Sequence, residues 1–109
     1  MQNQGSVQFG DIVMTILSNS NDLTVSEMSV PAGTVAALHH HPHEEVNYVV
    51  SGTLECTCDG NTETLVSGDY IKIPPNVEHN ITNSSNSDAK VLSIWTPSRQ
   101  DLMNKIIKS

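Results

Sequence analysis

The sequence predicts an all-β domain, an antiparallel sandwich or barrel, with one short helix at its C-terminal end. Two observations predict this class. Short segments rich in Val, Ile, Leu and Thr recur roughly every 8 to 12 residues, with Gly, Asn, Asp and Pro between them. The apolar spacing becomes helical only in the last stretch. A length of 109 residues suits a single domain, residues 1–109, built around one core.

Strands are expected where the apolar segments lie, and turns where glycine and proline interrupt them. Asp59-Gly60 is a tight hairpin signal, because both positions of such a turn favour positive φ. Gly52 and Gly68 mark two further corners. The expected strands cover residues 11–17, 22–30, 34–41, 45–51, 53–58, 62–66, 69–73, 77–82 and 89–96.

The C-terminal helix is expected in the segment SRQDLMNKIIKS, which follows the last strand. Ser98 is the expected N-cap, and Lys105 and Lys108 lie near the negative end of the helix dipole. The apolar positions that follow helical spacing are Leu102, Met103, Ile106 and Ile107. This helix is expected to pack against the barrel.

The charge balance favours a small molecule as partner. The net charge is −7 and the isoelectric point is near 4.9. Such a field repels the phosphate backbone of nucleic acids and the surface of anionic membranes, so neither is expected to bind. An anionic ligand would need a local positive group or a metal ion.

The sequence carries no segment that predicts membrane insertion or export. No apolar run reaches the roughly 18 to 20 residues of a spanning helix, and the start MQNQGSVQFG lacks a basic and an apolar region. Cys56 and Cys58 are two apart in an expected strand, so both face one side without disulfide geometry. Two free thiols fit a reducing compartment, and the protein is expected in the cytoplasm.

The segment from Gly33 to Gly52 contains the chemically informative residues. If residues 34–41 form a strand, His39 and His41 project from one face and His40 points away. Glu45 opens the next strand and can bring an oxygen to the same centre. Two histidines and a carboxylate with open positions are a known transition-metal arrangement.

A second segment, from Gly68 to Asn83, supplies His79 from a distant strand. Three histidines and one glutamate would leave one or two positions for water or substrate, which a catalytic metal needs. Structural zinc would more usually use cysteines. His40 and His43 are not expected to be ligands, because one alternates outward and the other lies in a turn.

Together the two segments resemble the paired signature motifs of the cupin superfamily. The matching positions are Gly33, His39, His41, Glu45 and Gly52 in the first motif, and Gly68, Pro74, His79 and Asn83 in the second. Asn76 departs from the usual Gly, but Asn also tolerates positive φ. The resemblance implies a small jelly-roll barrel, often a dimer, with one metal ion held by His39, His41, Glu45 and His79.

Strand alternation identifies further residues near this centre. If Glu45 faces inward, so does Asn47, which could orient a substrate, support Glu45 or bond buried backbone. On the last strand Ser93 and Trp95 share a face. Arg99 follows as the cation that an anionic substrate would need; its alternative role is an ion pair with Asp101 or Glu78.

The chain also resembles the small cupins of pectin and alginate breakdown, which open 4,5-unsaturated uronates to linear keto acids. The runs that carry this likeness are HHHPHEEVNYVVSG, GDYIKIPPNVEH and WTPSRQDLM. In that family an acid, an aromatic residue and an arginine act on the substrate, and by position they fall on Ser93, Trp95 and Arg99. Ser93 replaces the acid, and Glu45 stands where many members have Gln.

These observations favour a metal-dependent isomerase or ring-opening enzyme for a small sugar acid. Arg99 would pair with the carboxylate, Trp95 would stack on the ring and Asn47 would orient a hydroxyl. A metal-dependent dioxygenase and a non-catalytic small-ligand-binding protein are the alternatives. The ligand types suit nickel, zinc, manganese, iron or cobalt. A homodimer is also expected, through an apolar edge strand at IVMTIL, residues 12–17.

Overall fold

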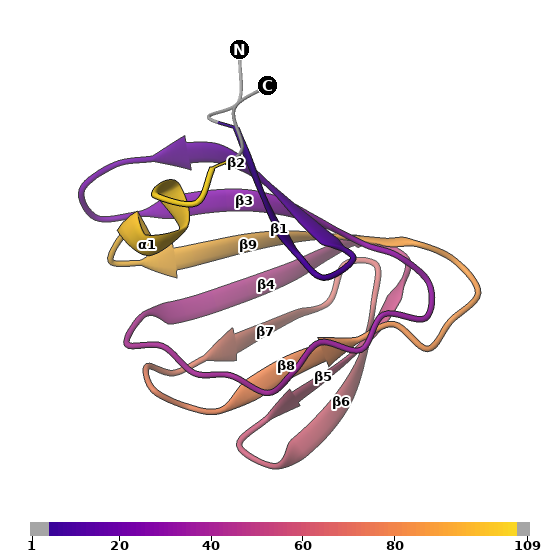
Figure 1. The fold of residues 1–109 in the computed structure, drawn as a ribbon. Helices are drawn as coiled ribbons and strands as arrows, with labels where there is room; N and C mark the ends of the chain where they lie inside the picture. Colours follow the sequence, from indigo (N-terminus) through magenta and orange to yellow (C-terminus); the bar gives the residue numbers. More distant parts are fainter. Residues whose placement is uncertain (1–4, 107–109) are drawn as a thin grey trace.

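A computed structural model describes residues 5–106, which form nine strands and one short helix (Figure 1). All strand neighbours are antiparallel. The elements are β1 Ser6–Phe9, β2 Ile12–Asn19, β3 Thr24–Val30, β4 Glu44–Ser51, β5 Thr53–Cys58, β6 Asn61–Val66, β7 Tyr70–Ile73, β8 His79–Thr82, β9 Ala89–Thr96 and α1 Gln100–Met103. The all-β prediction with a short C-terminal helix is confirmed.

The strands form two sheets with one apolar core between them. The larger sheet has six strands in the order β1-β2-β3-β9-β4-β7, and the smaller has three in the order β6-β5-β8. Met28, Val49 and Val91 from the larger sheet pack in one cluster with Leu54 and Ile81 from the smaller sheet. The two sheets therefore form a sandwich whose inner faces can hold a site.

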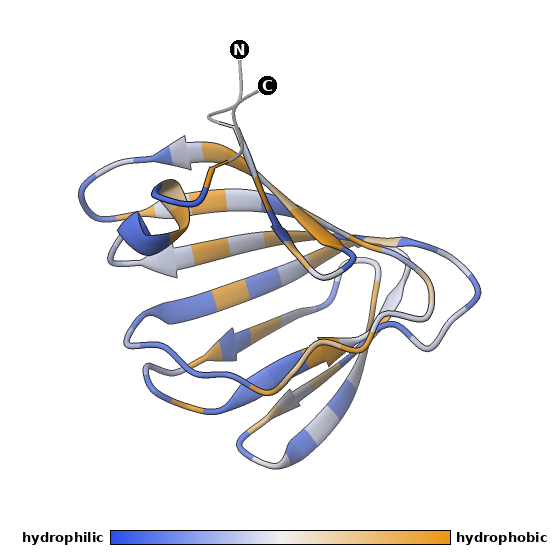
Figure 2. Ribbon diagram, viewed as in Figure 1, coloured by the Kyte–Doolittle hydropathy of each residue, from blue (hydrophilic) through white to orange (hydrophobic). Residues whose placement is uncertain are grey.

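Alternation along β4 and β9 follows the predicted pattern. Glu45, Asn47 and Val49 are buried on the inner face of β4, whereas Tyr48 and Val50 are exposed. On β9 the buried residues are Ala89, Val91, Ser93 and Trp95. Figure 2 shows hydrophobic and hydrophilic bands along these ribbons. The inner face thus carries polar side chains beside apolar ones, which is unusual for a core and points to function.

Residues 34–41 differ from the prediction, because they do not form a continuous strand. They make two isolated bridges to β8, Val35 to Thr82 and His39 to His79. Val35 and His39 are four positions apart along this segment, but their partners on β8, Thr82 and His79, are only three positions apart. One extra residue interrupts the ladder here, as in a β-bulge, and such irregularities often re-aim side chains next to a site.

The C-terminal helix is shorter than expected and begins later. Arg99, not Ser98, occupies the N-cap position, and no side chain caps the helix there. Leu102 is its buried residue and packs with Val7 and Trp95. The expected helical positions Ile107 and Lys108 lie outside the described residues.

The N-terminal edge of the larger sheet also differs from the prediction. Strand β1 was not expected, and it pairs with residues 12–15 of β2. The IVMTIL segment is therefore covered on both sides over most of its length, because β3 pairs with it from the other side. Over most of its length this segment therefore offers no free edge to a second copy of the chain, and a homodimer stays a prediction.

The turns follow the expected chemistry. Asp59 and Gly60 have φ values of 51° and 79°, so the hairpin between β5 and β6 is of the predicted kind. Asn76 has a φ of 65°, so it adopts the positive-φ conformation that a glycine favours.

Among the described residues, no helix is long and apolar enough to cross a membrane.

Candidate metal centre

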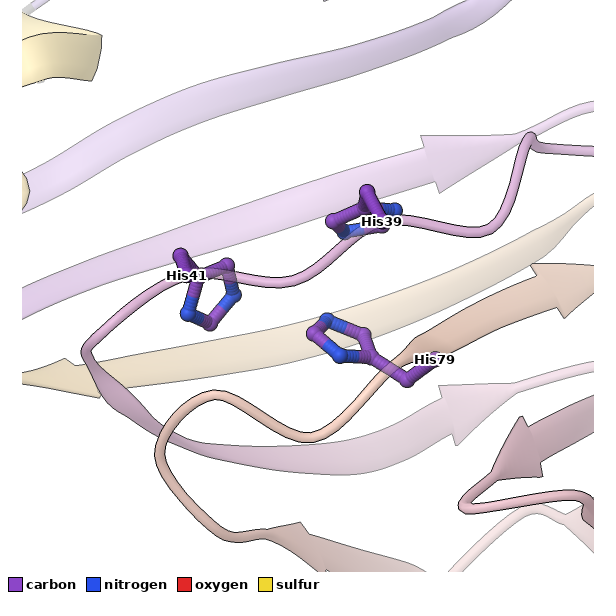
Figure 3. A group of neighbouring side chains, drawn as sticks. All are labelled: His39, His41 and His79. Carbon is purple, nitrogen blue, oxygen red and sulfur yellow. The ribbon is translucent and has the colours of Figure 1, made fainter.

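Three histidines converge at one point inside the mouth of the sandwich (Figure 3). His39 and His41 come from the segment before β4, and His79 begins β8. One ligand atom from each ring lies within 4.8 Å of the others. The centroids of the rings of His39 and His79 are 4.3 Å apart, and those of His41 and His79 are 4.9 Å apart. His41 and His79 are buried, and His39 is exposed toward the opening.

Backbone carbonyls fix the protonation of all three rings. The Nδ1 atoms lie 2.8 to 3.0 Å from the carbonyl oxygens of Ala37, His43 and Val77, respectively for His39, His41 and His79. A carbonyl oxygen only accepts, so each Nδ1 carries a proton. In the neutral rings the lone pair therefore resides on Nε2, the atom available to a metal ion.

Glu45 brings a carboxylate to these nitrogens. Its Oε1 lies 2.9 Å from Nε2 of His41 and 3.4 Å from Nε2 of His79. The side chain of Glu45 is 6% exposed. The Nε2 of His79 is buried and has no hydrogen-bond partner within the described residues. Lone pairs from nitrogen and oxygen thus face one another, and a cation, either a proton or a metal ion, must lie among them. The donor set fits a divalent transition metal.

The electrostatics of the centre keep the carboxylate charged. Burial by itself raises the pKa of Glu45, but the imidazoles of His41 and His79 and the indole N–H of Trp95 bring it well below its ordinary value. Burial lowers the pKa of His79, yet the Glu45 carboxylate and the Val77 carbonyl raise it above the ordinary value overall. Burial is the main reason that the pKa of His39 is lowered. The centre therefore offers one negative charge to a bound cation at neutral pH.

A buried chain of hydrogen bonds holds the Glu45 carboxylate. Asn47 Nδ2 donates to Glu45 Oε2 at 2.7 Å, and Ser93 Oγ donates to Asn47 Oδ1 at 2.7 Å. Trp95 Nε1 donates to Glu45 Oε1 at 2.6 Å. Ser93, Asn47 and Trp95 are at most 2% exposed. Of the roles expected for Asn47, support of Glu45 is the one that these contacts describe.

Ser93 and Asn47 were expected to contact a substrate, but neither lines the cleft. The centre opens into a cleft with a cavity volume of about 640 Å³, whose lining includes the three histidines, Glu45, Trp95 and Arg99. Ser93 and Asn47 do not belong to this lining. They lie behind Glu45, from where they reach a ligand only through its carboxylate.

Arg99 lies at the cleft but is already paired. Its Nε and Nη2 donate to the two carboxylate oxygens of Asp101 at 3.0 and 2.8 Å. Its guanidinium carbon lies 5.2 Å from the ring centre of Trp95. The Arg99 guanidinium lowers the pKa of Asp101 to about 2. The ion pair with Asp101, one of the two expected alternatives, is the arrangement present, and it uses the Nε and Nη2 edge of the guanidinium, one of the edges that could bind a substrate carboxylate.

The other two histidines and the two cysteines do not belong to the group of three histidines. His40 lines the cleft, and the ring of His43 lies 5.4 Å from that of His41. Cys56 and Cys58 are free thiols, and burial raises the pKa of Cys56 to about 12, which makes it unreactive. Sequence reasoning missed β1, whose last residue Phe9 lines the cleft, and the turn after it, whose Asp11 also lines the cleft.

Comparisons with known proteins agree with this architecture. A protein MJ1618 of Methanocaldococcus jannaschii, described as uncharacterized, is 36% identical over 75 residues, which are 68% of this chain and 60% of that protein. The pectin degradation protein KdgF of Dickeya dadantii is 26% identical over 98 residues, 88% of each chain. The structure of KdgF from Halomonas sp. matches with a TM-score of 0.80 at 26% identity, over 87% of this chain and 88% of the other.

The match to a family model covers the part of the chain that builds the site. The model of the cupin domain matches residues 26–95, which run from β3 to β9 and include all three histidines and Glu45. It spans well over half of the 109 residues. The sandwich, the histidine group and this match together show that the chain belongs to the cupin domain family.

Proposed function

We propose that this protein is a metal-dependent cupin enzyme. One divalent ion would be held by Nε2 of His39, His41 and His79 and by the carboxylate of Glu45. The observation that carries the proposal is the close approach of Glu45 Oε1 to two histidine nitrogens whose Nδ1 atoms are already committed to carbonyls. A bound ion would polarise a carbonyl or hydroxyl oxygen of a small molecule. Nickel, zinc, manganese, iron and cobalt all suit these donors.

The narrower form of the proposal is isomerisation of a small sugar acid, with ring opening of a 4,5-unsaturated uronate as the reaction. KdgF carries the name of a pectin degradation protein and aligns over 88% of this chain. Arg99 would leave Asp101 to bind the substrate carboxylate, and the Trp95 ring would underlie the guanidinium at the edge of the site. Asn47 and Ser93 would position Glu45 rather than touch the substrate.

Ligand binding without turnover is a second candidate, and one observation favours it. The hydroxyl of Ser93 stands where the related sugar cupins are expected to have an acid, and it is committed to Asn47. Proton transfer to a sugar then lacks that group. Absence of turnover with intact uronate binding would select this candidate.

Substitutions in the Arg99–Asp101 pair test the sugar-acid proposal. Arg99→Ala is expected to weaken binding or turnover of an unsaturated uronate by about 2 to 4 kcal/mol, because a bidentate charge-assisted contact is lost. Asp101→Asn should have the opposite effect on uronate affinity, because it frees the guanidinium. Both are measured by calorimetry and by the absorbance of the unsaturated ring.

A matched control separates this effect from general loss of charge. Lys90 pairs with Glu27 on other strands of the larger sheet and does not line the cleft. Lys90→Ala should leave uronate handling unchanged, and metal content should stay the same in all three variants. Equal uronate affinity in Arg99→Ala and the unmodified protein would refute the sugar-acid form and leave the metal proposal in place.

The proposal also covers the location of the protein in the cell, its partner and its assembly. Two free thiols, one of them partly exposed, suit the reducing cytoplasm. A small molecule is the proposed partner, and the net charge of −7 argues against nucleic acid and anionic membranes. A homodimer is proposed as the assembly.

A further inference from the structure

The cleft has two ends of different chemistry. At one end lie the three histidines, Glu45 and the Arg99–Asp101 pair. At the other end the lining is mostly apolar and includes Ile12, Met14, Met28, Ala36 and Ile81, which belong to one hydrophobic cluster. The two ends belong to one continuous cavity of about 640 Å³, a size typical of sites for drug-sized ligands.

Strand register gives the distance between the two ends. Thr24 pairs with Trp95 beside the metal centre, and Met28 pairs with Val91 four residues further along the same two strands. At roughly 3.3 Å per residue, Met28 lies about 13 Å from the level of Trp95. On the opposite wall Ile81 follows His79 by two residues, or about 7 Å. The apolar part of the lining therefore begins about 7 Å from His79 along β8, and Met28 lies about 13 Å from the level of Trp95 along β3.

The apolar end offers few partners to a hydroxylated ligand. The polar side chains of the lining near this end are those of Asp11, Thr34 and Asn80, and Asn80 already donates to the carbonyl of Ala36 at 2.9 Å. Hydroxyl groups buried against Met14 and Met28 would lose their hydrogen bonds to water, which costs free energy. Methionine side chains adapt their shape to apolar ligands instead.

We infer that the preferred ligand is amphipathic, with an oxygen-bearing head at the histidine centre and an apolar ring or chain that reaches about 7 to 13 Å from the head into the apolar end. The part of this inference that concerns the head depends on the proposed metal function, whereas the part that concerns the apolar body does not. A single uronate ring would occupy only the polar end. A molecule that combines the acidic group of a uronate with an apolar body is therefore expected to bind more tightly than the uronate itself.

Straight-chain alkyl hydroxamates of two, four, six and eight carbons test this inference. They are titrated into the cobalt-loaded protein by calorimetry, and into the metal-free protein by displacement of anilinonaphthalene sulfonate. Each added methylene is expected to lower Kd by about three- to fourfold, the value for burying one methylene group. The same slope is expected in both forms, because the metal contacts only the head.

Two variants assign the slope to the apolar end. Met14→Gln should weaken binding of the eight-carbon probe by at least about tenfold and leave the two-carbon probe within about twofold. Leu17→Gln on the same strand is the control, because Leu17 is exposed and does not line the cleft. Ala36→Phe, which fills the apolar end, provides a second variant with the same expected pattern if Met14→Gln does not fold.

The outcomes separate this inference from the metal proposal. Failure of the two-carbon probe to bind the cobalt-loaded protein would count against the metal centre, while the series on the metal-free protein would still decide the apolar end. A Kd that does not change with chain length in either form would overturn the inference. So would a slope that Met14→Gln and Ala36→Phe both leave intact.

Discussion

Replacing His79 with alanine is expected to abolish stoichiometric metal binding at micromolar concentrations. Four ligands share roughly 10 to 16 kcal/mol in well-formed sites, so one ligand accounts for about 2.5 to 4 kcal/mol, or roughly 100- to 1,000-fold in affinity. His79 is 2% exposed, and its Nε2 has no alternative partner within residues 5–106. His41→Ala should behave alike, because His41 is also buried and touches Glu45.

Elemental analysis and calorimetry with first-row divalent ions measure this effect. His40→Ala is the matched control, because His40 neighbours the centre in sequence but lies outside the group of three histidines. It should keep full metal content. If His79→Ala and His40→Ala bind metal with equal affinity, the assignment of the centre is wrong.

Replacing Asn47 with leucine is expected to weaken metal binding by about 10- to 100-fold, although Asn47 is not a ligand. The change removes the donor to Glu45 Oε2 and leaves the Ser93 hydroxyl without its acceptor. The buried groups left unpaired should also lower the free energy of unfolding by about 1 to 3 kcal/mol. Metal affinity is measured by calorimetry, and stability by denaturant titration.

A graded control distinguishes positioning of Glu45 from a general loss of stability. Ser93→Ala breaks only the outer link of the chain, so its effect on metal affinity should be smaller than that of Asn47→Leu. The fluorescence of Trp95, the single tryptophan, adds a separate signal, because its indole N–H donates to Glu45. Metal binding should change this emission in the unmodified protein, and Asn47→Leu should require more metal for the same change. Unaltered metal affinity in Asn47→Leu would contradict the positioning role.

Local patterns predicted most of the fold and the histidine group. Alternation along β4 identified Glu45 and Asn47 as inward-facing, and the Asp59-Gly60 turn follows from the φ preferences of these two residues. That His39 and His79 lie at one site was predicted from the two motifs, whereas their β-bridge was not predicted. The one-residue slip before His39 has no local signal, because it depends on the β8 partner.

Contacts between distant segments account for what the sequence did not reveal. The end of β1 and the turn after it line the cleft together with segments far away in the sequence, and β1 is too short for a clear alternation. The ion pair of Arg99 with Asp101 is an exception, because the two residues are only two positions apart and the sequence already offered this pair as one alternative. The hydrogen bond from Ser93 to Asn47 requires that β9 pair with β4, which composition does not determine.

The metal content of the protein shows whether the three histidines and Glu45 bind an ion. Protein purified without chelator is analysed for all first-row metals, and the metal-free protein is titrated with manganese, iron, cobalt, nickel and zinc. One tightly bound ion per chain is expected, and it should be lost in His41→Ala and His79→Ala. If the protein purifies without metal and binds none of these ions stoichiometrically, the assignment of the metal centre is wrong.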